Sequence, residues 1–127
     1  MFAADIEWYK FEGASDSEIA NLESSTNYEL PALYIKLLRF SNGGECSLKV
    51  QPFTFVLDSV SDVVCYLQSD SSLFYKDYFI FGGNGAGELL AIQKSTGAIV
   101  SIDACNSNLE EIVLVAQSFS DLISLVG

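Results

Sequence analysis

The residues with the spacing of a phosphate-binding site lie in a glycine-rich loop at residues 82–88. Gly82 and Gly87 match the two glycines of the motif G-x-x-x-x-G-K-[ST]. The motif then requires a lysine and a hydroxyl, but here Glu88 and Leu89 follow. The apolar run after the loop also favours a strand, whereas a phosphate loop leads into a helix whose N-terminus faces the anion. We therefore interpret residues 82–88 as a hairpin turn.

Other reactive groups are scarce. The chain has no histidine, which excludes His-activated nucleophiles and His-ligated metals. The cysteines Cys46, Cys65 and Cys105 are widely separated and form no C-x-x-C pair, so we expect free thiols, no metal and no cofactor. Two carboxylates can perform acid–base chemistry. The adjacent pair at Glu110 and Glu111, however, is typical of a solvated surface, so we expect no enzyme.

The net charge of the chain limits the classes of molecule that it can bind. There are 17 acidic and 6 basic residues, a formal net charge of −11. Such a surface repels nucleic acid and anionic lipid, and it attracts basic proteins. The simpler interpretation is that the acidic residues only keep a small protein in solution.

Length and hydropathy predict one domain spanning residues 1–127. Half of the residues are apolar, enough for one core. No apolar run approaches the roughly 18 residues of a membrane span. The N-terminal region carries Asp5 and Glu7 and has no basic stretch, so it does not match a signal peptide. We expect a cytoplasmic protein with no membrane contact.

The central elements that would position functional groups are three consecutive antiparallel strands. Short runs rich in Phe, Ile and Val occur at residues 79–81, 89–92 and 98–102, and glycine-containing turns separate them. Glycine permits the positive φ angles that tight turns need. We expect Gly82 and Gly87 to be structural, with at least one of them at positive φ.

About four helices are expected to flank this sheet. Their signals are a capping box at Ser15 and Glu18, an apolar stripe within residues 30–44, a capped stripe at residues 58–67 and a second capping box at Ser118 and Asp121.

The remaining segments are less regular. Residues 47–57 predict one or two strands in which Phe53, Phe55 and Leu57 alternate, and residues 69–72 predict a polar loop. Residues 112–115 fit either a strand or the start of a helix. The aromatic-rich residues 1–13 predict a segment laid over the core, with an aromatic binding patch as the alternative.

Several short patterns follow one another along the chain: Leu30-Pro31, Tyr34 and Asn42-Gly43-Gly44-Glu45; Phe79-Ile80-Phe81-Gly82 with Gly87; Gly97; and Ala116-Gln117-Ser118-Phe119-Ser120-Asp121-Leu122. Their order resembles the SUKH superfamily over about residues 15–126. Two features depart from the family: the hairpin has Asn84 where acidic residues are common, and the strong acidity belongs to this sequence.

The resemblance implies an α+β domain with a central, mostly antiparallel sheet flanked by helices. It also implies a bacterial immunity protein that binds and neutralises a toxin, often a nuclease. The alternative is a regulatory or scaffold module that recognises an endogenous protein, as in relatives of a fungal regulator of cell-wall synthesis. In the first case the acidic surface predicts a basic toxin as the partner.

Polar residues outside the apolar periodicity, on loops beside the firmest elements, are the candidate partner-binding residues. They are Asn42, Glu45, Asp58, Asn84, Glu88 and Asp103.

Overall fold

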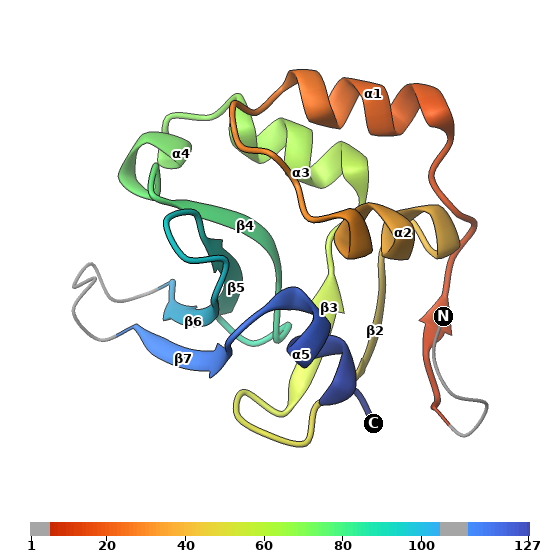
Figure 1. The fold of residues 1–127 in the computed structure, drawn as a ribbon, viewed down its shortest axis with the longest axis vertical. Coiled ribbons are helices and arrows are strands. Elements are labelled where there is room, and N and C mark those ends of the chain that lie inside the picture. The colour runs from red at the N-terminus through yellow and green to blue at the C-terminus, as the bar shows by residue number, and fades with distance from the viewer. Residues whose placement is uncertain (1–5, 105–111) are drawn as a thin grey trace.

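A computed structural model of the chain describes residues 6–104 and 112–127 (Figure 1). Within these ranges seven strands form one sheet in chain order, each antiparallel to the next. The strands are β1 (Tyr9–Lys10), β2 (Gly44–Ser47), β3 (Thr54–Leu57), β4 (Tyr78–Gly83), β5 (Glu88–Gln93), β6 (Ile99–Asp103) and β7 (Val113–Ala116). The helices are α1 (Asp16–Ser24), α2 (Ala32–Phe40), α3 (Val60–Leu67), α4 (Ser71–Phe74) and α5 (Phe119–Ser124). The α+β class predicted from the sequence is confirmed.

The three central strands are confirmed as β4, β5 and β6. Both turns between them use glycine at positive φ, with Gly87 at 99° and Gly97 at 79°. Gly82 serves a different purpose, because a Cβ there would lie 2.1 Å from the Val56 carbonyl oxygen. It lets β3 and β4 approach each other.

Three helices begin at a serine that satisfies free backbone N–H groups. Ser15 and Glu18 form a reciprocal capping box on α1, as predicted. Ser59 accepts a hydrogen bond from the Asp62 N–H at the start of α3, and Ser118 accepts one from the Asp121 N–H at the start of α5.

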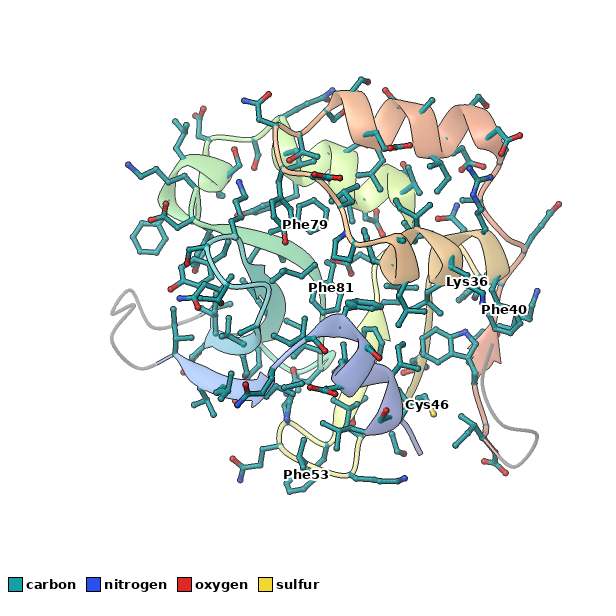
Figure 2. All side chains as sticks on the ribbon, in the orientation of Figure 1. Lys36, Phe40, Cys46, Phe53, Phe79 and Phe81 are labelled. Atoms are coloured by element: carbon teal, nitrogen blue, oxygen red, sulfur yellow. The ribbon has the colours of Figure 1, made fainter. Side chains whose placement is uncertain are left out.

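The core lies between one face of the sheet and the helices α1, α2, α3 and α5 (Figure 1). Tyr34 of α2 is at its centre, with ring centroids 5.6 Å from both Phe79 and Phe119 and 6.0 Å from Phe81. Figure 2 shows Phe79 and Phe81 between the strands and the helices. Aromatic pairs in such edge-on arrangements contribute about 0.5–1.5 kcal/mol each beyond the area they bury.

The opposite face of the sheet is covered only in part. A second cluster of Ile80, Ala91, Val100 and Ile102 packs with several partly buried side chains on this side of β4, β5 and β6. On β2 and β3 the burial alternates from residue to residue, so one side faces the core and the other faces solvent. The sheet therefore has an open face near its N-terminal edge.

The structure corrects two sequence predictions and decides a third that was left open. Phe53 does not share the inward alternation of Phe55 and Leu57, because it precedes β3 at φ 67° and is 57% exposed. It lies on the loop between β2 and β3, away from the core (Figure 2). The segment at residues 69–72 is not a loop throughout, because the short helix α4 begins at Ser71 and brings the helices in the described residues to five. Of the two possibilities at residues 112–115, the structure has a strand, β7.

The N-terminal aromatic residues differ in how far they are buried. The ring centroid of Trp8 lies 5.6 Å from that of Phe55, so Trp8 covers the core as expected. Tyr9 and Phe11 are 63% and 49% exposed. Only part of the segment is therefore laid over the core.

The thiols of Cys46 and Cys65 are free. Within residues 6–104 and 112–127, no group of three or more potential ligands could hold a metal ion, and no helix has the length and apolar character of a membrane span. Cys105 and the pair Glu110 and Glu111 lie outside the described residues.

Candidate functional site

The open sheet face is formed by β1, β2 and β3. Tyr9 pairs with Glu45, and Glu45 pairs with Val56, so cross-strand pairing places these three side chains in one row. Their chain neighbours Cys46, Phe55 and Leu57 point to the core. The row lies on the solvent side of the sheet.

Three adjoining hollows follow this face toward the β4–β5 hairpin. The strand hollow, about 450 Å³, is lined by Glu7, Tyr9, Glu45 and Thr54 among others. The aromatic hollow, about 400 Å³, shares Tyr9 and Glu45 with it and adds Phe11, Val56 and Asp62. The hairpin hollow, about 250 Å³, shares Val56 and adds Asp58, Glu88 and four glycines. Because neighbouring hollows share residues, we treat them as one feature, the acidic groove.

Five carboxylates line the acidic groove, and no lysine or arginine does. They are Glu7, Glu45, Asp58, Asp62 and Glu88. Carboxylates held near one another without a positive neighbour create a negative potential, which a concave surface concentrates. The groove therefore favours a cationic ligand.

Asp58 is a half-buried carboxylate of the groove. Burial raises the pKa of Asp58, and the nearby Asp62 carboxylate raises it further. In the part of the chain that the structure describes, no side chain donates a hydrogen bond to the Asp58 carboxylate. A positive group entering the hairpin hollow would relieve both the desolvation and the repulsion from Asp62.

Asn42 holds three helices together. Its Oδ1 accepts a hydrogen bond of 2.8 Å from the Val60 N–H at the start of α3, and its Nδ2 donates one of 3.1 Å to Glu18 of α1. Asn42 itself follows α2. Its side chain lines the aromatic hollow but is already bonded within the protein.

The hairpin residues are ordered by a similar internal bond. The Asn84 Oδ1 accepts hydrogen bonds from the N–H groups of Ala86 and Glu88, at 2.8 and 3.0 Å. The Ser101 hydroxyl donates to the Glu88 carboxylate. Asn84 therefore shapes the turn, and Glu88 borders the hairpin hollow.

The structure brings four of the six sequence-predicted residues to the acidic groove. Asn42 and Glu45 line the aromatic hollow, and Asp58 and Glu88 line the hairpin hollow. Asn84 lies in the turn beside them. Asp103 is exposed and pairs with Glu88 in the β5–β6 register, but it lines none of the three hollows.

Sequence reasoning missed Glu7 and Asp62 and did not choose Tyr9 and Phe11 as binding residues. A signal for three of them was present, because Glu7, Tyr9 and Phe11 recur with the period of two that places side chains on one side of a strand. Asp62 is an exposed residue in the first turn of α3.

Comparison with known proteins places this fold in a family. No curated protein matches the chain. The model of the SMI1 / KNR4 family (SUKH-1) matches residues 13–125, which include the five helices of the described residues and all strands from β2 to β7. This family is generally non-catalytic, and membership is consistent with an immunity or a regulatory domain. The chain therefore belongs to the SMI1 / KNR4 family (SUKH-1).

Proposed function

We propose that this protein is a non-enzymatic, cytoplasmic immunity protein that binds and neutralises a basic bacterial toxin, such as a nuclease, through the acidic groove. The observation that supports this function best is the set of five carboxylates lining the groove without a lysine or arginine. Family membership supports it as well.

Charge explains how such a protein would neutralise a nuclease. A nuclease grips phosphates with a basic surface, so an acidic partner of complementary shape can cover that surface. The net charge of −11 would also steer the encounter and speed association at low salt. Neutralisation by this route needs no catalytic residue.

The direct test is co-expression of the protein with candidate basic toxins, scored by cell survival. We expect Glu45→Lys and Asp62→Lys to weaken protection and to slow association with the purified toxin by about tenfold at low salt. Both side chains are exposed, so the variants should fold. Glu23→Lys makes the same charge change on α1, outside the groove, and should have a smaller effect.

Two results would contradict the proposal. If the protein protects against none of the basic toxins but binds an endogenous protein through the groove, it is a regulatory module. If Glu23→Lys weakens protection as much as the groove variants, net charge alone is responsible and the groove is not the binding site.

A further inference from the structure

Two exposed aromatic rings, those of Tyr9 and Phe11, line the aromatic hollow. Tyr9 and Phe11 lie on the same side of the N-terminal segment, with ring centroids 5.2 Å apart and an angle of 61° between the ring planes. They remain 63% and 49% exposed. Large aromatic side chains left in water are typical of protein-binding surfaces, where they supply contact area at a small entropic cost.

The same hollow also contains two carboxylates, from Glu45 of β2 and Asp62 of α3. Both residues are exposed. Among the described residues, neither carboxylate accepts a hydrogen bond or forms an ion pair. Their oxygens are available to a ligand, and no lysine or arginine lines the hollow to compete for them.

The hollow is large enough to receive an amino-acid side chain. Its volume is about 400 Å³. Gly43 and Gly44 contribute no side chains to it, and Val56 supplies an apolar surface. Apolar surface, aromatic rings and carboxylates together match the stem, the flat face and the N–H groups of an arginine side chain.

Lysine matches these groups less well. An ammonium group is compact and strongly hydrated, whereas a guanidinium is planar, stacks on aromatic rings and donates paired hydrogen bonds to a carboxylate. Both cations would be attracted by the negative charge of the groove. Only arginine would contact the aromatic rings and the carboxylates of the hollow at the same time.

We propose that the aromatic hollow is the binding site for an arginine side chain of the basic protein partner. The arginine would insert between the Tyr9–Phe11 rings and the carboxylates of Glu45 and Asp62. This inference rests on the proposed function and deepens it, because it names the partner group that anchors the complex.

The test uses the purified protein and three small probes. N-acetyl-arginine N-methylamide is titrated against the ¹⁵N-labelled protein, and the backbone amide shifts of Gly43, Gly44 and Asp62 are followed by NMR. The citrulline amide has the same planar shape without the charge, and the lysine amide has the charge without the planar group. We expect saturable shifts at these amides with arginine, and binding at least about threefold weaker with either other probe.

Two variants locate the binding within the hollow. Phe11→Ala removes a ring and Asp62→Asn removes a charge while keeping the side-chain size. Each should weaken arginine binding severalfold, and Phe11→Ala should also remove the preference for arginine over lysine. Glu23→Gln removes a charge elsewhere and should leave both affinities unchanged. The amide spectrum of each variant reports whether it is folded.

The inference is overturned if the three probes shift the same amides equally, if none shifts them, or if Phe11→Ala keeps the preference for arginine. These outcomes are distinct from failure of the proposed function. If the protein neutralises a toxin through Glu45 and Asp62 but shows no preference for arginine, the proposed function holds and the arginine site is contradicted. If the protein prefers arginine but neutralises no toxin, the arginine site holds and the proposed function is contradicted.

Discussion

At the scale of single residues, Asp58 links the stability of the protein to its binding surface. Its pKa is raised by burial and then by Asp62, so the folded protein holds this proton more tightly than the unfolded chain does. A carboxyl group with a raised folded-state pKa lowers the free energy of unfolding as pH rises from its ordinary value of 3.8 through the raised value. At neutral pH the ionised Asp58 is therefore a stability cost.

We predict that Asp58→Asn raises the free energy of unfolding at pH 7, because it removes a half-buried charge that lies beside Asp62. The gain should shrink as pH falls and vanish below the ordinary pKa of Asp58, where both proteins are neutral at this position. Urea denaturation across this pH range measures the difference, with Glu23→Gln as an exposed control. A gain that does not change with pH would show that Asp58 ionisation is not its cause.

Two glycines should respond differently to substitution. Gly87 is at φ 99° with nothing within 4 Å of an added Cβ, so Gly87→Val should cost about 1–3 kcal/mol through backbone strain alone. Gly82→Ala should cost at least about 2 kcal/mol, because its Cβ would press on the backbone of β3 and separate two strands.

Chemical denaturation of both variants measures these costs. Gly87 also lines the hairpin hollow, so partner binding by folded Gly87→Val is measured separately from its stability. A Gly87→Val protein that kept its full stability would show that the positive φ at this turn carries no strain.

At the scale of elements, the hydrogen bonds of Asn42 connect three helices. The residue follows α2, accepts a hydrogen bond from the first N–H of α3 and donates one to Glu18 of α1. Its backbone N–H also donates to the Glu12 carbonyl, which fixes the N-terminal segment that continues from Phe11. Of these elements, α3 and the N-terminal segment line the aromatic hollow together with Asn42 itself.

We predict that Asn42→Ala lowers the free energy of unfolding by about 1–3 kcal/mol, because it leaves a partly buried N–H group without its acceptor. Asn42→Asp keeps that acceptor but places a second carboxylate against Glu18, so it should be destabilised at neutral pH and partly recover in acid. Thermal melts at two pH values separate the cases. If Asn42→Asp lost as much stability in acid as at neutral pH, repulsion from Glu18 would not be the reason.

At the scale of the whole molecule, the same negative charge has opposite effects on stability and on binding. Like charges repel within the compact fold, while they attract a basic partner. Salt shortens the range of both effects, from about 30 Å at 0.01 M to about 8 Å at 0.15 M. Natural binding surfaces often carry such a stability cost.

We therefore expect salt to raise Tm and to slow association with the partner. A gain of about 1 kcal/mol corresponds to roughly 3–6 °C for a chain of this size. The variant Glu45→Gln should melt slightly higher than the parent at low salt and associate more slowly. Calorimetry and stopped-flow measurements over one salt series test both effects. A Tm that falls with salt, or an association rate that does not change, would contradict the electrostatic explanation.

The sequence alone determined the elements whose signals are local. Propensity and periodicity predict elements whose residues lie close together in the chain. Examples are the capping box of Ser15 and Glu18, the apolar stripe of α3 and the strand–turn–strand pattern around Gly87. Phe53 broke its pattern because its positive φ turns the side chain out of the alternation. The choice between strand and helix at residues 112–115 was made by pairing with β6.

The acidic groove depended on the tertiary structure. Tyr9 meets Glu45 through the pairing of β1 with β2, and Asp62 joins them because α3 begins beside that sheet edge. No local pattern records which distant residues become neighbours, so the sequence indicated the acidic charge but not its position. Strand pairing decided that Glu45 of β2 and Glu88 of β5 border one groove with Asp58, which follows β3, because cross-strand hydrogen bonds set which side chains share a face.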